Sequence, residues 1–524
     1  MKLLKYSFRH VFVLSFALFF AMATSLFFLQ VNSDIEALPI NGMEDILQFD
    51  GSYDWETDLD VLTSSSDYMS YSEYRDDYCL AGSTPSECAS AASGKYIRFD
   101  TAEELYRFSV DVSFEEIYFT GNPTEDVKLS DDKIDVLLSL NYVLGNNIDY
   151  SIMQAKAFIP IGFAFNDVAQ NVYERAFTGT LDGQGFYIDN LYVAGYDHLV
   201  YVDNVDENTT IDIAMSEHYS MFNYNAGTIE NLGLVDANLE ILELHTDITK
   251  LSNLVGFNMS TGIVNNVYVI DTRTTSTTAG MRYQVGTSSE DFQAAGIIHT
   301  NQGTFTDAYY VSPVVINGNY INKFHVQPVL YQNSGTIDNL VYDSEVYMYP
   351  TVIVGSSTFY IDTPNGYAVG ETTNTLKSTS SSLNDVGASW YFYPSDGYPR
   401  LQGFTYDDIN GVYEIDNAVQ FAFFSKVLQF VSLNHGITYA ASDYVLTGNI
   451  DMSTVAPNAY TVPTNTFTGS LSGYNSGGAD LGDNYYIYNL NLGENIIRGT
   501  EYYGGLFSIL GAGSEISNLN FSQS

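Results

Sequence analysis

A short motif built around glycine and asparagine recurs along this chain and constrains the fold more than any other feature. The lead glycines of its clearest copies are Gly227, Gly262, Gly303 and Gly335. Two positions after each of them stands an apolar residue, and Asn231, Asn266 and Asn339 stand four positions after three of them. A short repeat of this kind buries little surface alone, so neighbouring copies must complete one another's core.

The pattern within each copy is typical of short strands with one buried face. Ile229, Leu232 and Leu234 are spaced for a strand with a small register break in its middle. We expect the Asn-x-Gly corner to supply a residue with positive φ that turns the chain between sheet faces. Asn231, Asn266 and Asn339 would then stack into a hydrogen-bonded ladder. The repeat predicts an all-β solenoid; a β-sandwich, the alternative, does not need one turn motif repeated in this order.

Longer segments recur in the same order, which indicates a tandem duplication. Tyr142-Val-Leu-Gly-Asn-Asn-Ile-Asp matches Tyr444-Val-Leu-Thr-Gly-Asn-Ile-Asp, and Phe177-Thr-Gly-Thr-Leu matches Phe467-Thr-Gly-Ser-Leu. Each unit opens with a short helical segment, for which Thr101 and Asn417 are the predicted N-caps. We expect a first solenoid unit at 95–403, a linker at 404–412 and a second, incomplete unit at 413–524. Either a further C-terminal part or a capping partner is expected to cover the last copy, because an open coil edge invites aggregation.

The start of the chain resembles an export signal. Residues 1–33 carry Lys2, Lys5 and Arg9 before a long apolar run, and the segment is either cleaved or kept as an N-terminal membrane anchor. Residues 34–94 are acidic and rich in Ser and Tyr, which predicts a solvated stalk. In an exported protein, Cys79 and Cys88 are expected to form a disulfide, two free thiols being the alternative.

Several of these segments resemble the bacterial surface proteins that carry the GLUG motif, repeats also found in some immunoglobulin A-cleaving proteases and large adhesins. The matching segments are Phe158-Ile-Pro-Ile-Gly, Phe177-Thr-Gly-Thr-Leu-Asp-Gly-Gln-Gly, Leu254-Val-Gly-Phe-Asn, Ala295-Gly-Ile-Ile-His-Thr-Asn, the Gly-Thr-Ile-x-Asn turns, and Trp390 with Gly397-Tyr-Pro-Arg-Leu. The resemblance covers roughly 95–403 and 413–524 and implies a right-handed parallel β-helix. It implies no catalytic residue.

Charge and motif content exclude several classes of function. The chain has 63 Asp and Glu against 19 Lys and Arg, a formal net charge of −44, so nucleic acid is not an expected partner. No His-Glu-x-x-His, Gly-x-Ser-x-Gly or phosphate-binding Gly-Lys-Ser/Thr motif occurs. We expect no catalytic residue, cofactor or dedicated metal site, although the acidic surface would attract divalent cations weakly. The seven histidines are dispersed, and each is expected to be a surface or packed residue.

The sequence therefore predicts an exported bacterial protein, extracellular or at the cell surface, that is a scaffold or adhesin binding an unknown glycan or protein. Membrane contact is expected only if residues 1–33 stay uncleaved. A candidate binding surface consists of tyrosines with flat, amphipathic rings, namely Tyr309, Tyr310, Tyr347, Tyr349, Tyr391, Tyr393 and Tyr398. The alternative function is a β-helix polysaccharide lyase or glycoside hydrolase, for which Asp131-Asp132, Asp407-Asp408 and Asn434-His435-Gly436 are weak candidates.

Overall fold

The protein is mainly β, with parallel sheets and few helices, which confirms the all-β part of the expectation. The computed structural model describes residues 68–79, 83–112, 129–153, 156–166, 172–195, 218–241, 249–271, 281–285, 291–312, 314–318, 323–347, 352–353, 363–384, 390–391, 398–401, 403–407, 410–428, 439–457, 459–463, 466–473, 485–492, 496–498, 501–503 and 505–522. The predicted export segment, 1–33, lies outside these residues. No helix within the described residues is long and apolar enough to cross a membrane.

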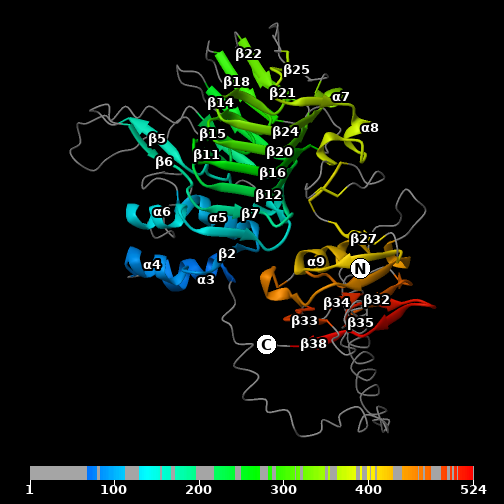
Figure 1. Ribbon diagram of the computed structural model, residues 1–524. Helices are drawn as coiled ribbons and strands as arrows, with labels where there is room; N and C mark the ends of the chain where they lie inside the picture. Colours follow the sequence, from blue (N-terminus) through cyan, green and yellow to red (C-terminus); the bar gives the residue numbers. More distant parts are fainter. Residues whose placement is uncertain are drawn as a thin grey trace, which may run out of the picture. The chain divides into compact units, whose positions relative to one another are not determined.

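One long sheet of parallel strands runs through the first predicted unit (Figure 1). Its main order is β1 (Tyr68–Ser70), β2 (Tyr96–Phe99), β3 (Asn141–Leu144), β7 (Thr180–Asp182), β12 (Thr228–Val235), β16 (Ile263–Ile270), β20 (Thr304–Val311), β24 (Thr336–Asp343) and β26 (Val369–Glu371). Beside β12 lies β8 (Tyr187–Asp189), which also pairs with β4 (Ile148–Asp149). Every pairing in this sheet is parallel.

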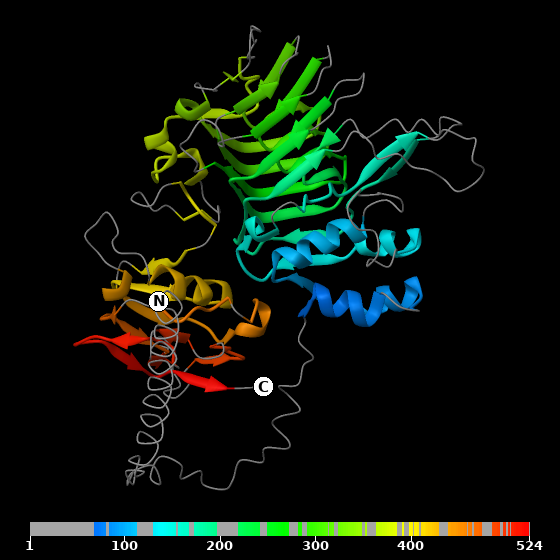
Figure 2. The ribbon, with the colours of Figure 1, turned by 180° about the vertical axis from the view of Figure 1, so that it is seen from behind.

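Two further parallel sheets accompany the later part of the long sheet. The second sheet consists of β10 (His218–Tyr219), β14 (Thr249–Ser252), β18 (Asp291–Ala295) and β22 (Lys323–Gln327). The third sheet consists of β11 (Phe222–Asn225), β15 (Val255–Asn258), β19 (Ile298–Asn301) and β23 (Leu330–Asn333). The chain passes through the second, third and long sheets in that order four times, and we call each passage a rung. Figure 2 shows these strands stacked side by side.

Shorter parallel sheets are formed by strands that follow the strands of the long sheet along the chain. They pair β9 (Tyr192–Gly195) with β13 (Asn238–Ile241), and they join β17 (Met281–Val285), β21 (Val314–Gly318) and β25 (Val352–Ile353). The antiparallel pairs among the described residues are β5 (Phe163–Asn166) with β6 (Val172–Arg175), β27 (Thr405–Asp407) with β28 (Val412–Ile415), and β34 (Ile496–Arg498) with β35 (Glu501–Tyr503). Parallel pairing therefore dominates.

The core is filled by in-register apolar side chains on the long strands. Ile229 pairs with Val264, and Val264 with Phe305, and all three side chains are fully buried. The predicted register break lies between Ile229 and Leu232, because Asn231 takes a left-handed conformation with φ of 51°. Asn231 has no partner in the register between β12 and β16. Ile229 and Leu232, on either side of it, can therefore both face the interior.

The sheet begins earlier than the predicted unit boundary at residue 95. Strand β1 pairs with β2 and is followed by the helical segments α3 (Tyr71–Tyr74), η1 (Arg75–Cys79) and α4 (Pro85–Ala91). The second half of the predicted 34–94 stalk is therefore folded in its described part, because Tyr71 and Tyr74 are fully buried. The sequence predicted that these tyrosines are solvated, but their rings are buried in a hydrophobic core.

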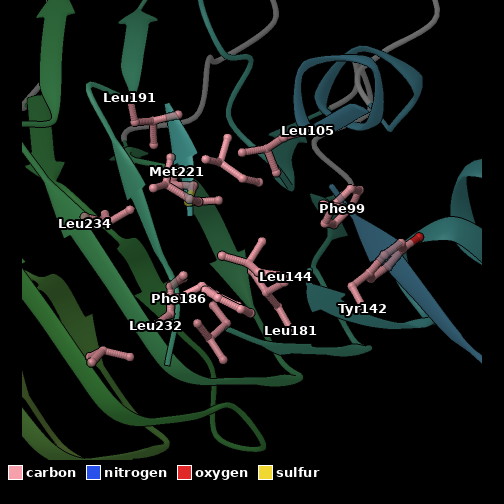
Figure 3. Packing of buried hydrophobic residues seen from close by; sticks show 14 of the residues in the cluster. Phe99, Leu105, Tyr142, Leu144, Leu181, Phe186, Leu191, Met221, Leu232 and Leu234 are labelled. Carbon is pink, nitrogen blue, oxygen red and sulfur yellow. The ribbon is translucent and has the colours of Figure 1, made fainter. Parts of the chain in front are cut away.

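Helices α5 (Ala102–Asp111) and α6 (Asp131–Leu138) lie at this end of the long sheet (Figure 1). Thr101 caps α5 as predicted, accepting a hydrogen bond from the Glu104 N–H at 3.3 Å. The ring of Phe108 on α5 packs 4.7 Å from the ring of Tyr142 on β3. Figure 3 shows Leu105 on this helix pointing into the same core as residues of the long sheet.

The second unit repeats the first in its order of elements. It contains β28, α9 (Ala418–Val427), η4 (Tyr439–Ala441), β29 (Asp443–Leu446), β30 (Ile450–Asp451), η5 (Met452–Thr454), β31 (Thr466–Phe467), β32 (Ser470–Ser472), β33 (Tyr486–Tyr488), β36 (Ile509–Leu510), β37 (Glu515–Ser517) and β38 (Asn520–Ser522). Asn417 caps α9 as predicted, accepting from the Gln420 N–H at 2.9 Å.

The duplication extends to individual hydrogen bonds. The hydroxyl of Tyr142 donates to the Leu137 carbonyl at 2.7 Å, and that of Tyr444 donates to the Tyr439 carbonyl at 2.9 Å. Asn190 and Asn489 both have φ of 56°. These shared local geometries agree with a tandem duplication.

The last part of the first unit covers the outer face of the long sheet. It includes α7 (Ser344–Tyr347), α8 (Thr373–Leu376) and η3 (Ser382–Asn384). Trp390 packs its ring 5.1 Å from Tyr309 and 6.0 Å from Tyr268, and all three belong to a second buried hydrophobic cluster. This cluster separates the tyrosines of the long sheet from solvent.

Candidate functional site

Cys79 and Cys88 form a disulfide between η1 and α4, which confirms the predicted pairing. Both cysteines are fully buried, and the hydroxyl of Tyr74 donates to the Cys88 carbonyl at 3.0 Å. Thr84 caps α4 with a reciprocal side-chain and backbone exchange with Glu87, so the short helix has a defined start. The disulfide has a structural role, because it joins two short elements that pack on the edge of the long sheet.

The lead glycines of the repeat allow close stacking and do not supply positive φ, so that part of the prediction is wrong. Within β12, β16, β20 and β24, the residues with positive φ are instead Asn231, Asn266, Asp307 and Asn339. At Gly303 an added Cβ would lie 2.1 Å from the Gly262 carbonyl oxygen, and at Gly335 it would lie 2.1 Å from the Gly303 oxygen. A side chain cannot fit there, because the carbonyl of the preceding rung already occupies its place.

The predicted asparagine ladder exists in segments. Asn266 Nδ2 donates to Asn231 Oδ1 at 3.1 Å, and Asn231 Nδ2 donates to Asp182 Oδ1 at 3.0 Å. Further along the stack, Asn339 Nδ2 donates to Asp307 Oδ1 at 2.8 Å. Each of these side chains is half-buried. Together with the glycines, these residues hold the rungs in register.

A second amide column, which the sequence analysis missed, is more deeply buried. Asn225, Asn258, Asn301 and Asn333 follow one another on the strands of the third sheet. Each Nδ2 donates to the next Oδ1 at 2.8 Å, and the first three side chains are fully buried. The sequence contained a signal, because Asn225, Asn301 and Asn333 each stand two positions before a lead glycine. Two extra residues separate Asn258 from Gly262 and disrupt that spacing.

None of the described tyrosines of the predicted surface is fully exposed. Tyr309 and Tyr310 are fully buried, and Tyr347 is 5% exposed. Tyr391 and Tyr398 are half-buried, while Tyr349 and Tyr393 lie outside the described residues. The hydroxyl of Tyr309 donates to the Pro399 carbonyl, so the segment resembling Tyr-Pro-x-Leu packs onto the outer face of the long sheet. The sequence suggested flat exposed rings, but tertiary packing buries them.

Asp131 and Asp407, two of the weak carboxylate candidates for sugar hydrolysis, have structural partners, while Asp132 is exposed in the first turn of α6. Asp131 lies in the first turn of α6 and forms an ion pair with Arg175 at 2.8 Å. Asp407 ends β27 and accepts from the Asn410 N–H at 3.1 Å. Asp408 and Asn434-His435-Gly436 lie outside the described residues. Within the described residues, no group of three His, Cys, Asp or Glu side chains is placed to hold a metal ion.

A different group of polar and aromatic side chains lies on the outer side of the second and third sheets. On the second sheet, strand register aligns His218, Lys250, Gln293 and His325. Their neighbours Leu251 and Ala294 are fully buried, so this column faces away from the core. On the third sheet, strand register aligns Tyr224, Phe257, Thr300 and Gln332. One residue before each of these on the same strands stand four residues that the register leaves unpaired, namely Asn223, Gly256, His299 and Tyr331. We call these twelve positions the histidine face.

The rings of the histidine face form a connected cluster. The ring of His218 lies 5.3 Å from that of His299 and 5.7 Å from those of Tyr224 and Phe257. His299 stacks on Tyr331 at 4.7 Å. Gly256 makes this contact possible, because an added Cβ there would lie 2.5 Å from the Cβ of His218. The two histidines come from rungs that are not adjacent, which is why sequence spacing did not reveal them.

Burial and charge make the two inner histidines neutral. Burial, with a contribution from the charge of Lys250, lowers the pKa of His218 to about 3. Burial also lowers the pKa of His299, and the nearby His218 and Lys250 act in the same direction. His299 Nδ1 lies 2.9 Å from the Thr300 hydroxyl, while its buried Nε2 has no hydrogen-bond partner. A buried polar atom left in this state is costly and needs an explanation.

The outer members of the histidine face are accessible. Lys250, Phe257, Gln293, His325 and Tyr331 are half-buried, and Gln332 is exposed. None of the twelve positions is an Asp or Glu, whereas three of the seven histidines of the chain occur there. Asp291, two positions before Gln293 on β18, is in backbone register with Lys323. The histidine face therefore offers bases, amides and rings in a chain of strongly acidic composition.

Comparison of the chain with protein-family models, with curated proteins and with solved structures gave no match. The resemblance to proteins with the GLUG motif therefore stays a prediction from the quoted segments. The candidate site depends on the geometry of the histidine face alone.

Proposed function

We propose that this chain is an exported bacterial cell-surface scaffold, wound as a right-handed parallel β-helix, that binds an extracellular glycan on the histidine face. The four rungs support the β-helix, because each passes through the same three sheets in the same order and pairs in parallel with its neighbour. The buried column from Asn225 to Asn333 supports it further, since a continuous amide column requires equivalent corners to lie above one another.

The observation that carries the binding proposal is the composition of the histidine face. Half-buried aromatic rings at Phe257 and Tyr331 offer flat apolar surfaces of the kind on which sugar rings can pack. Thr300 and Gln332 place hydrogen-bonding groups in the same column as Phe257, and Gln293 lies on the second sheet between Lys250 and His325. Rungs about 4.8 Å apart repeat the arrangement along the stack, which suits an extended chain of sugars. A protein ligand would not need this regular spacing.

Glycan-array binding with the secreted chain tests this function. The double variant Phe257→Ala/Tyr331→Ala should lose binding, while Tyr96→Ala, which removes a 40% exposed tyrosine on β2, should retain it. Circular dichroism should show that all three chains keep the same strand content. Equal binding by the two variants would contradict the assignment to the histidine face.

Incubation of the bound glycan with the same protein separates binding from catalysis. A scaffold should leave the glycan intact over many hours. Release of unsaturated or reducing sugar ends would instead favour the polysaccharide lyase or glycoside hydrolase that the sequence left as the alternative. Cell fractionation with surface proteolysis checks the proposed location, and retention in the cytoplasm would contradict it.

A further inference from the structure

We infer that a cavity beside helix α9 binds a single neutral sugar ring. The cavity has a volume of about 390 Å³, and small-molecule sites typically have volumes of about 300–1,000 Å³. Six of its described lining residues carry rings or amides, namely Tyr68, Gln184, Tyr391, Asn417, Gln420 and Phe423. None of the described lining residues belongs to the histidine face, so the inference goes beyond the proposed function.

The walls of this cavity come from both predicted units, which contact each other directly. The N–H of Ala456, close to the lining residue Thr454, donates to the Gly145 carbonyl at 2.8 Å. On the side of the first unit, Gly185 lies so close to Leu401 that an added Cβ would be 2.7 Å from its carbonyl oxygen. Leu401 itself lines the cavity and is buried. The cavity is therefore enclosed by packed backbone from distant parts of the chain.

The chemistry of the wall favours a neutral, polar ligand with a flat apolar face. No described lining residue is Asp, Glu, Lys, Arg or His, in a chain that contains 63 acidic residues. An aromatic ring offers an apolar surface to the C–H face of a sugar. An amide both donates and accepts hydrogen bonds, as sugar hydroxyl groups do. A charged ligand would lose its water in this cavity without gaining an opposite charge.

The aromatic rings of the wall are held in place by the protein itself. The ring of Tyr68 stacks on that of Tyr96 at 5.5 Å, and the ring of Phe423 lies 5.2 Å from that of Phe404. Tyr391 takes part in a β-bridge through its backbone. Because the neighbouring side chains already order these rings, a sugar that packs on them meets a small entropic cost.

Gln184 lines the cavity and carries a hydrogen-bond donor that the protein does not use. Its Nε2 is buried and has no hydrogen-bond partner. The backbone of Gln184 is fixed, with φ of 51° and its N–H donated to Asp182 Oδ1 at 2.8 Å. The terminal torsion of a glutamine is broad, so the amide can turn toward an oxygen of a bound sugar. Such a ligand would supply the partner that a buried polar group normally has.

Saturation-transfer NMR of the full chain with the methyl glycosides of glucose, galactose and N-acetylglucosamine tests this inference. At least one glycoside should receive saturation, and isothermal titration then gives its affinity. Val419→Phe should weaken binding about tenfold or more, because the added ring would occupy the space of the ligand. Gln184→Asn should weaken it about three- to tenfold, since Asn tolerates the positive φ but carries its amide on a shorter side chain.

Val136→Phe on α6 is the matched control for Val419→Phe. Both valines are half-buried, lie on helices and pack against the same hydrophobic core, but Val136 is not among the described lining residues. The affinity of Val136→Phe for the glycoside should equal that of the unmodified chain. Circular dichroism should show the same secondary structure in all of these proteins.

Methyl glucuronide and indole complete the set of probes. Methyl glucuronide should bind about tenfold or more weakly than the neutral glycoside, and equal affinity would overturn the inference. Tighter binding of indole than of every glycoside would also overturn it and assign the cavity to an apolar molecule. Equal affinities of Val419→Phe and Val136→Phe for the glycoside would place the sugar outside the cavity. Absence of saturation transfer to all three glycosides would overturn the inference but leave the glycan-array test of the histidine face unaffected.

Discussion

The buried amide column makes a sharp prediction for Asn258. Asn258 accepts from Asn225 and donates to Asn301, both at 2.8 Å, and its side chain is fully buried. In Asn258→Ala, Asn301 Oδ1 loses its donor, while Asn225 Nδ2 keeps a bond to the Gly227 carbonyl at 3.3 Å. Asn258 Nδ2 also donates to the Gly262 and Thr304 carbonyls, both at 3.2 Å, and these bonds are lost too. The orphaned acceptor and the lost hydrogen bonds together predict a destabilisation of about 2–4 kcal/mol.

Two further variants separate the hydrogen bonds from the volume of the side chain. Asn258→Asp keeps the volume but faces Asn301 Oδ1 with a carboxylate that has no proton to donate, so we expect at least the same loss at neutral pH. Asn333→Ala removes the bond from Asn301 and two local bonds with the Gly335 backbone, but at the half-buried end of the column, where water can replace them. It should therefore cost about 1 kcal/mol or less.

Urea unfolding followed by tryptophan fluorescence measures these differences. Trp390 packs against Tyr268 and Tyr309 of the long sheet and so reports on the four-rung stack. A Trp55→Phe background removes the other tryptophan of the chain. The midpoint should shift at nearly constant slope if only stability changes. Equal costs at Asn258 and Asn333, within about 0.5 kcal/mol, would refute the idea that the column contributes through buried amide bonds.

Three further perturbations follow from the same structure. Gly303→Ala would place a Cβ 2.1 Å from the Gly262 carbonyl oxygen and should lower the free energy of unfolding by about 1–3 kcal/mol. Gly448→Ala, whose Cβ would meet only the Asp416 oxygen at 3.4 Å, should change it by less than about 0.5 kcal/mol; equal urea midpoints would contradict the stacking argument. Replacing both Cys79 and Cys88 with Ser should increase proteolysis within 68–94 by loosening that segment by about 2–3 kcal/mol, and unchanged cleavage in limited proteolysis would contradict this. Burial depresses the folded-state pKa of His218 and His299 below the unfolded value near 6.5, so the unfolded chain binds more protons at low pH. Stability should therefore fall as the pH drops below 6.5, by about 2 kcal/mol at pH 5 for His218, with His299 acting in the same direction. The variant His218→Gln/His299→Gln should flatten this part of the pH–stability curve, and an unchanged slope would show that the histidines are not buried as neutral groups.

The sequence predicted local features well because their causes are local. Thr101 and Asn417 stand at the start of helices and have side chains that accept from open N–H groups, and both caps form. Cys79 and Cys88 are close in sequence, so one short loop decides whether they meet. The left-handed positions were predicted at the wrong place: Asn231, Asn266 and Asn339, predicted only as ladder residues, take that conformation, which Asn tolerates better than most residues.

The histidine face could not be predicted, because it depends on register between distant rungs. His218 and His299 are separated by a whole rung and by loops of unequal length, and Gly256 provides the space between them. The prediction that Tyr309 and Tyr310 are exposed was wrong for a related reason. The left-handed residue Asp307 shifts the alternation of the strand, and Trp390 covers the outer face. A one-residue change in register exchanges the two faces of a strand.

The two predicted units differ in the residue that pairs with an equivalent phenylalanine. Phe177 pairs with Asn225 at the start of the amide column, and the equivalent Phe467 pairs with Leu510. An apolar leucine cannot donate to or accept from a stacked amide, so the column is absent at that position of the second unit. The shared elements therefore build the start of each unit, whereas the amide column and the histidine face both belong to the four-rung stack of the first unit. Since both require exact register between rungs, a change that slips the amide column should also disperse the rings around His299.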